Sequence, residues 1–302
     1  MMSDAIRTHS EMLQSPGLTE RMLSALRRAA GKLAEEPLGL AGFAIIGLLL
    51  LVAAFAPLIA PYDPTAQSLS NALQPPSLAH LAGTDEFGRD IFSRLLYGSR
   101  ITIQTIFFVS IIVGPIGLVI GVVSGFFGGR TDAILMRATD IVLSFPSLIL
   151  ALAFAAALGA SLSTAIIAIS LTAWPPIARL ARAEALVVRN ADYVAAARLY
   201  GASRLRVLFL YIAPMCIPSV IVRLTLNMAG IILTAASLGF LGLGAQPPAP
   251  EWGAMISSGR KFMLDFWWVA VMPGIAILLT SLAFNIVGDT LRDIMDPRHA
   301  RS

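Results

Sequence analysis

Long stretches without any charged residue are the feature that most limits the folds open to this chain. No Asp, Glu, Lys or Arg lies between Glu36 and Asp63, and segments 101–129 and 141–178 are equally free of charge. A helix needs about 20 apolar residues to cross the core of a bilayer. Charged residues make up 13% of the chain, against roughly 25% in soluble domains. The sequence therefore predicts an all-α, polytopic membrane protein.

Six membrane spans account for these stretches. The 38-residue segment 141–178 is long enough for two helices if the chain reverses at 159–163, with the first helix starting near Ala133. A single tilted helix followed by a re-entrant segment would also fit this segment. Pro115 and Pro146 are expected to kink their helices. The predicted spans are 37–62, 101–129, the two within 133–178, 214–237 and 266–288.

The distribution of Lys and Arg predicts the orientation of the spans. Of the 22 Lys and Arg residues, 16 lie on the side of the two termini, five lie on the opposite side, and Arg223 lies within a span. Positive loops stay in the cytoplasm, so both termini are expected there, with the chain in the cytoplasmic (inner) membrane. The predicted organisation is an N-terminal cytoplasmic segment (1–37) and a transmembrane domain (38–302). The outer loops are then 61–100 and 241–265.

The N-terminal segment contains an amphipathic pattern over residues 18–33, which is typical of a helix lying at the membrane surface. A solvated basic tail that serves only to orient the chain explains the same residues.

The sequence lacks the residues that several kinds of functional site require. The single cysteine, Cys216, has no partner for a disulfide, and the three histidines lie in polar segments, so we expect no metal site and no catalytic site. The one Gly-Lys pair, Gly31-Lys32, is followed by Leu33 rather than Ser or Thr, so no P-loop is present. The net charge of +4 arises in loops beside membrane spans, which argues against nucleic acid as a partner. We expect neither an enzyme nor a cofactor on this chain.

Two features within the spans carry hypotheses. Gly117, Gly121, Gly125 and Gly129 recur every four residues, a groove that favours close packing of another helix and, less often, a ligand. Asp140 and Arg223 are ionisable residues near or within spans, and both are candidates for lining a transport pathway. Arg223 could equally reach the inner membrane surface with its long side chain.

The inner loop 179–214 is long for a connection between spans, which predicts that it has a structure and a function of its own. We expect one short helix over 191–200, ended by Gly201, and a second that begins after the N-cap Ser203. Both have apolar residues at helical spacing. The two helices could dock a partner protein or lie on the lipid surface.

The stretch D-Y-V-A-A-A at 192–197, followed by Gly201-Ala202-Ser203 and Pro214, resembles the EAA loop of ABC-importer permeases. The residues that match at the family spacing are Ala196, Ala197, Gly201 and Pro214. The family pattern is E-A-A, three residues, Gly, nine residues and I-x-L-P. In this chain Ala195 stands in place of Glu, Tyr211 in place of Ile and Ala213 in place of Leu. The candidate residues for coupling to an ATPase are Asp192, Ala195, Ala196, Ala197, Gly201, Ala202 and Pro214.

Three further motifs resemble the C-type permease subunit of the dipeptide, oligopeptide and nickel importers. The first outer loop has G-T-D-E-F-G-R-D at 83–90, in which Asp85, Gly88, Arg89 and Asp90 are the candidate motif residues. The second outer loop has F-L-G-L-G at 240–244 and E-W-G at 251–253, and the C-terminus has matching residues over 288–298. Ala235 departs from the pattern, because related chains often have Glu there.

This resemblance implies the permease fold of type I ABC importers and a division of labour among subunits. The expected partners are a second, homologous permease, two ATP-binding subunits that hold ATP and Mg²⁺, and a periplasmic or lipid-anchored substrate-binding protein. The implied function is ATP-driven import of di- or oligopeptides, with nickel or another small solute as the alternative substrate. A stand-alone secondary transporter is a further alternative, which the scarcity of acidic residues in the membrane and the EAA-like loop disfavour.

Overall fold

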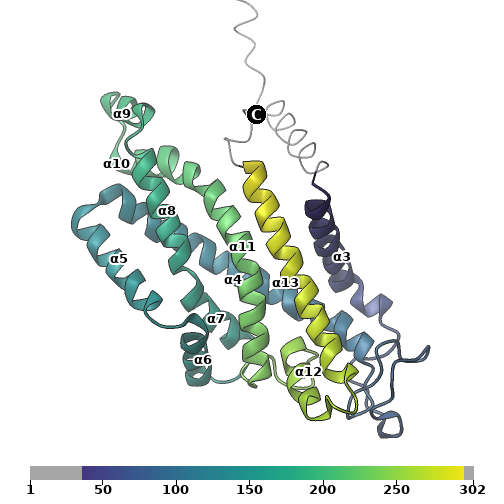
Figure 1. Cartoon of the computed structure of the whole chain (residues 1–302). Helices are drawn as coiled ribbons and strands as arrows, with labels where there is room; N and C mark the ends of the chain where they lie inside the picture. Colours follow the sequence, from purple (N-terminus) through teal and green to yellow (C-terminus); the bar gives the residue numbers. More distant parts are fainter. Residues whose placement is uncertain (1–35, 296–302) are drawn as a thin grey trace, which may run out of the picture.

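The computed structural model describes residues 36–295, in which nearly all regular structure is helical (Figure 1). Five helical segments are long and apolar enough to cross a membrane, and the number is six if a bent pair of helices counts as one broken span. The five are α3 (Pro37–Ile59), α4 (Ile91–Phe127), α7–α8 (Leu162–Val188), α10–α11 (Arg204–Phe240) and α13 (Trp268–Met295), and the bent pair is α5 (Gly129–Leu143) and α6 (Ser147–Leu158). The predicted all-α polytopic fold is confirmed for this part of the chain. The amphipathic pattern at 18–33 and the motif residues after 295 lie outside the described residues.

The helices form a bundle with two distinct ends (Figure 1). The start of α3 and the end of α13 lie toward the same end as α9 (Asp192–Leu199) and α10 (Arg204–Val207). The opposite end contains α12 (Trp252–Gly259) and the irregular segment 60–90. We refer to them as the α9–α10 end and the α12 end. With α5 and α6 counted as one crossing, the chain crosses six times, so both ends of the described chain lie at the α9–α10 end.

Several helices extend beyond the apolar windows that predicted them. Helix α4 begins at Ile91 rather than near residue 101, because Asp90 caps it by accepting the backbone N–H of Ser93 at 2.8 Å. Helix α13 likewise continues to Met295, past the predicted end at 288. A charge-free stretch of sequence indicates only the part of a helix that can face lipid. These helices are longer than their charge-free stretches because they continue into polar segments that are folded outside the apolar region.

The 38-residue charge-free segment does split in two, as predicted. The chain reverses at Gly159, whose φ is +90°, and α7 (Leu162–Ala173) starts with a capping box between Ser161 and Thr164. The third span is not one helix: α5 and α6 meet at 87° beside Pro146. Proline disfavours helix geometry in the residue before it, so the expected kink is a full break. Pro115 lies inside α4 without ending it.

The inner loop is shorter than predicted, because helices enter it from both sides. Helix α8 (Pro175–Val188) occupies its first ten residues. Helix α9 confirms the predicted first helix. The second begins after Ser203 as expected, but it is not separate: α10 continues through a π-helical segment (Leu208–Ile212) into α11 (Ala213–Phe240).

The glycine repeat of α4 packs against α8, which forms the most extensive helix contact of the bundle. A Cβ on Gly117 would lie 2.7 Å from the Ile177 Cβ, and a Cβ on Gly125 would lie 2.8 Å from the Ala185 Cβ. The predicted close packing is therefore confirmed, and no ligand fits between these helices. Gly129 is the exception, because it begins α5 and has no neighbour within 4 Å.

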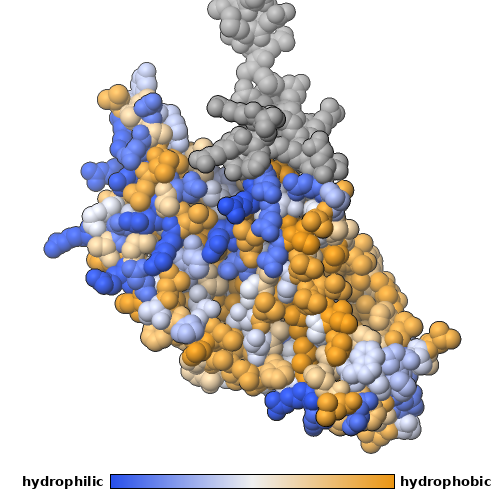
Figure 2. Space-filling view, in the orientation of Figure 1, coloured by the Kyte–Doolittle hydropathy of each residue, from blue (hydrophilic) through white to orange (hydrophobic). Residues whose placement is uncertain are grey.

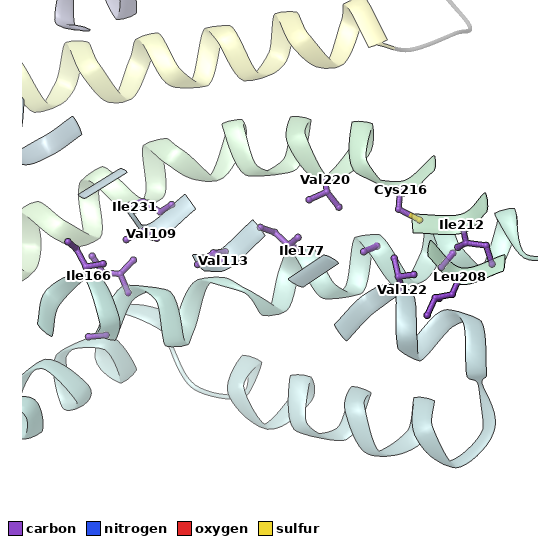
Figure 3. Close-up of a cluster of buried hydrophobic side chains, with 14 of the residues drawn as sticks. Val109, Val113, Val122, Ile166, Ile177, Leu208, Ile212, Cys216, Val220 and Ile231 are labelled. Carbon is purple, nitrogen blue, oxygen red and sulfur yellow. The ribbon is translucent and has the colours of Figure 1, made fainter. Parts of the chain in front are cut away.

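Buried aliphatic side chains from α4, α7, α8 and α11 fill the core beside this contact (Figure 3). The outside of the bundle is also apolar: Leu48 is 61% exposed and Leu58 is 81% exposed. Figure 2 shows this surface as a broad orange band between blue areas at the α9–α10 end and near the α12 end. A surface this apolar is expected where lipid, rather than water, surrounds a protein.

Candidate functional site

Helices α9 and α10 form a compact projection at their end of the bundle (Figure 1). Gly201 ends α9 with a φ of +80°, and the backbone N–H of Ala202 donates to the carbonyl of Ala197 at 3.0 Å. This is the hydrogen bond of a Schellman-type cap, which a glycine at this position favours. The hydroxyl of Ser203 then accepts the backbone N–H of Arg206 at 3.4 Å and starts α10. The two caps fix the angle between the helices.

The outer surface of this projection is apolar and basic. Leu199 is 89% exposed and Tyr200 is 93% exposed, and Leu205 and Phe209 on α10 and the π-helical segment are exposed as well. An exposed patch of large apolar side chains is typical of a site that contacts another protein or a membrane. Of the candidate coupling residues, Ala197 is buried, Ala196 and Ala202 are half-buried, and Asp192, Ala195, Gly201 and Pro214 are exposed.

Ion pairs hold α5 against α8, directly beneath the projection. Arg182 donates from Nε and Nη2 to the two carboxylate oxygens of Asp132, both at 2.6 Å, and the hydroxyl of Ser124 also donates to Asp132. Asp140 pairs with Arg179 at 2.6 Å, and both side chains are more than half exposed. Asp140 therefore lies at the α5–α8 contact.

The first outer motif forms a buried ion-pair cluster at the α12 end. Asp85 accepts from Nε of Arg89 at 2.6 Å and lies 3.6 Å from Nε of Arg94, and all three residues are buried. Gly88 has a φ of +71° and leaves no room for a side chain beside the carbonyl of Ser68. Asp90 caps α4, and its other carboxylate oxygen accepts a hydrogen bond from Nδ1 of His80 at 2.9 Å. The motif therefore folds segment 60–90 onto the start of α4.

Two tryptophans attach this segment to the rest of the α12 end. The indole N–H of Trp268, at the start of α13, donates to the carbonyl of Thr84 at 3.3 Å. The indole N–H of Trp252, at the start of α12, donates to the carbonyl of Leu95 at 3.2 Å. The two predicted outer loops thus form one folded cap.

The second outer motif contains a buried carboxylate. Glu251 caps α12 by accepting the backbone N–H groups of Gly253 and Ala254, at 2.9 and 2.7 Å. Burial raises the pKa of Glu251 above its usual value, and the two N–H groups oppose that rise. Gly239 leaves the space that the carboxylate fills. Ala235 lines the same small cavity as Glu251.

Arg223 lines a cavity of about 490 Å³ near the α9–α10 end of α11. Its polar neighbours there are Glu184 of α8, Ser219 of α11 and Arg292 of α13. Of the two candidate pathway residues, Arg223 therefore faces an open cavity, whereas Asp140 takes part in a helix contact. The structure does not bring these two residues together.

Sequence reasoning passed over several residues that the structure places at these sites. Asp132 and Arg182 pair across α5 and α8, and Glu184 and Arg292 line one cavity from α8 and α13. No spacing along a single segment indicates either contact. Glu251 is the first residue of the E-W-G motif at 251–253, and its position directly before an apolar helix is typical of a capping carboxylate.

Comparisons with known proteins agree on one family. Residues 117–301 match the family described as the inner membrane component of binding-protein-dependent transport systems. Residues 24–76 match the N-terminal transmembrane domain of oligopeptide transport permease C.

Curated relatives are similar over most of their length. A probable D,D-dipeptide transport system permease of Escherichia coli K12 is 50% identical over 87% of this chain and 88% of its own. A di/tripeptide transport system permease of Pseudomonas aeruginosa UCBPP-PA14 is 44% identical over 86% of this chain and 88% of its own. A dipeptide transport system permease of E. coli K12 is 45% identical over 85% and 88%. The chain, with its helical bundle, capped projection and folded outer loops, belongs to the family of binding-protein-dependent transport system inner membrane components.

Proposed function

We propose that this chain is one of two pore-forming subunits of an ATP-driven importer of short peptides. The exposed apolar projection of α9 and α10 carries this proposal, because it is a rigid contact site at the end of a bundle that has a membrane-facing surface. Family membership supports the role of a membrane component, and the printed names of the relatives support peptides as the substrate.

The partners follow from what the projection needs. Leu199, Tyr200 and Leu205 require a protein surface to bury them, and an ATP-binding subunit on the cytoplasmic side would provide it. This assignment places the α9–α10 end in the cytoplasm and the α12 end outside. The cap formed by segment 60–90 and α12 would then meet the substrate-binding protein.

Coupling in this arrangement is mechanical. ATP binding draws the ATP-binding subunits together and moves the projections that they hold. Helix α8 would carry that motion to α4 through the glycine contact and to α5 through the ion pairs of Arg179 and Arg182. The two permease bundles would then rock between states open to opposite sides of the membrane.

The test is uptake into cells that carry or lack this gene, with labelled dipeptides, oligopeptides and nickel offered separately and with ATP depletion as a control. The proposal expects ATP-dependent peptide uptake that disappears on deletion and returns with the gene. Loss of nickel uptake alone would replace the substrate. Uptake that persists without ATP, or a protein that purifies in mild detergent without an ATP-binding subunit, would contradict the proposed role.

A further inference from the structure

The cavity beside Arg223 combines charges of both signs in a space suited to a small ligand. It is formed where α8, α11 and α13 come together, and its volume of about 490 Å³ falls within the range of roughly 300–1,000 Å³ seen for ligand pockets. Leu180, Val222 and Leu226 supply apolar walls, and the polar side chains are Glu184, Ser219, Arg223 and Arg292. Figure 2 shows blue surface over the upper parts of α11 and α13, above a more apolar region.

The two arginines of this cavity are available to a ligand. Within residues 36–295, no carboxylate lies within 4 Å of the guanidinium of Arg223 or Arg292, whereas Arg89, Arg179 and Arg182 each have an acidic partner. A guanidinium binds a carboxylate through two parallel hydrogen bonds. The guanidinium groups of Arg223 and Arg292 can therefore bind a carboxylate from a ligand, because residues 36–295 supply none to them.

Glu184 allows the cavity to bind a positively charged group as well. Glu184 accepts one hydrogen bond from the hydroxyl of Ser219, at 2.9 Å. A carboxylate has about four acceptor positions, so Glu184 can still receive an ammonium group. The two arginines can bind a negative group and Glu184 a positive one. A short peptide with free ends is a zwitterion and has both groups.

Three polar side chains and one glycine form a track on α11 that leads from the cavity toward the α12 end. Asn227, Gly230, Thr234 and Ser237 follow Arg223 at steps of three or four residues, so they lie on one side of the helix. None of the four is buried in this chain. Figure 2 shows a pale band along α11 between more orange surface on either side.

This track distinguishes a peptide from a lipid as the occupant of the cavity. Polar side chains along a membrane helix face a water-filled path or another protein rather than lipid tails. An anionic lipid headgroup would also meet repulsion from Glu184. Both observations favour a ligand that travels along α11.

We propose that Arg223 and Arg292 bind the α-carboxylate of a peptide at the cytoplasmic end of its path, while Glu184 receives its α-amino group. This inference rests on the proposed function, and it adds a site that recognises the two ends of the peptide without regard to its side chains. The binding is non-covalent and needs no co-reactant.

The test uses the complete importer in liposomes, supplied with saturating amounts of loaded binding protein. Maximal uptake is measured for a labelled dipeptide with free ends and for the same dipeptide with a C-terminal amide. The variants are Arg223→Gln, Arg292→Gln and Arg223→Lys. Arg137→Gln is the matched control, because Arg137 is an exposed arginine of α5 that does not line the cavity.

The expected result is selective for the carboxylate. Arg223→Gln and Arg292→Gln should each lower maximal uptake of the free dipeptide about tenfold, the loss typical of one charged hydrogen bond. Uptake of the amide should equal that of the wild type, and Arg223→Lys should recover part of the loss. ATP hydrolysis stimulated by the binding protein reports that each variant complex is intact.

Three results would overturn the inference while leaving the proposed function standing. Equal losses for the free dipeptide and the amide would assign the arginines a structural role. A loss seen only in liposomes with phosphatidylglycerol, and absent in those of phosphatidylcholine alone, would assign them to lipid. Variants that purify without the second permease would assign them to the subunit interface. A wild-type complex that transports neither dipeptide would instead refute the proposed function.

Discussion

Single residues of this chain matter most where a missing side chain lets two backbones meet. At Gly121, an added Cβ would lie 2.6 Å from the Cβ of Ala181 and closer still to the carbonyl of Ala178. Real Cβ atoms do not approach so closely, so α4 and α8 would have to separate. Separation would also loosen the aliphatic core beside this contact.

Gly121→Ala is therefore expected to destabilise the protein by about 1–3 kcal/mol, the usual cost of overpacking. Reversible unfolding in mixed micelles measures the change. Gly47→Ala on α3 is the matched control, because nothing lies within 4 Å of its added Cβ, and alanine there favours the helix. Equal stability of the two variants would show that α4 and α8 adjust without cost.

The buried ion pairs of the first outer loop also depend on a single residue, Asp85. Asp85 pairs with both Arg89 and Arg94, and each of the three is at most 6% exposed. Asp85→Asn keeps the volume but removes the only carboxylate that lies within 4 Å of these two guanidinium groups among the described residues. We expect a loss of about 3–5 kcal/mol, against about 0.5 kcal/mol or less for Asp265→Asn, an exposed site in the same cap. A small effect of Asp85→Asn in the same unfolding assay would contradict the role of this cluster in holding the cap.

At the scale of helices, the angle between α9 and α10 depends on one backbone conformation. Gly201 is exposed and no atom would meet its Cβ, so the constraint is its φ of +80° rather than space. Asparagine tolerates this conformation, whereas a β-branched residue does not.

We therefore expect Gly201→Asn to preserve peptide uptake per ATP hydrolysed. Gly201→Val should lower that ratio severalfold while the complex continues to hydrolyse ATP. The two rates are measured together in liposomes that contain the full importer. Tight coupling in Gly201→Val would show that the projection tolerates a change of angle.

The sequence predicted which segments are helical better than it predicted where each helix begins and which helices join into one. Charge-free stretches placed the membrane crossings, and Gly201 and Ser203 correctly marked the end of one helix and the start of the next. The same reasoning separated α10 from α11 and began α4 ten residues late, since polarity marks the edge of the lipid and not the end of hydrogen bonding. The contact of Asp132 with Arg182 spans 50 residues, and that of Trp268 with Thr84 spans 184, so no local pattern contains them.

For the whole molecule, the separation of its two polar ends determines how it sits in a membrane. Leu199 is 89% exposed at the α9–α10 end, and Leu264 is 99% exposed at the α12 end. The native Cys216 is buried, which leaves the chain suited to cysteine labelling.

We expect Leu264→Cys, and not Leu199→Cys, to react in intact cells with a maleimide that cannot cross the membrane. Inside-out vesicles should reverse this result, because the excess of Lys and Arg predicts that the α9–α10 end lies in the cytoplasm. The unsubstituted protein should stay unlabelled in both preparations. Labelling of Leu199→Cys in intact cells would invert the proposed orientation.

The unbroken run from α10 through the π-helical segment to the end of α11 gives the molecule a lever. Its 37 residues span about 55 Å at 1.5 Å per residue. If such a rod pivots near its middle, a tilt of about 10° displaces each tip by about 5 Å in opposite directions. A push on the tip at the α9–α10 end would thus swing the tip at the α12 end the opposite way in the same stroke, without unfolding of the helix and without a series of small rearrangements between the two tips.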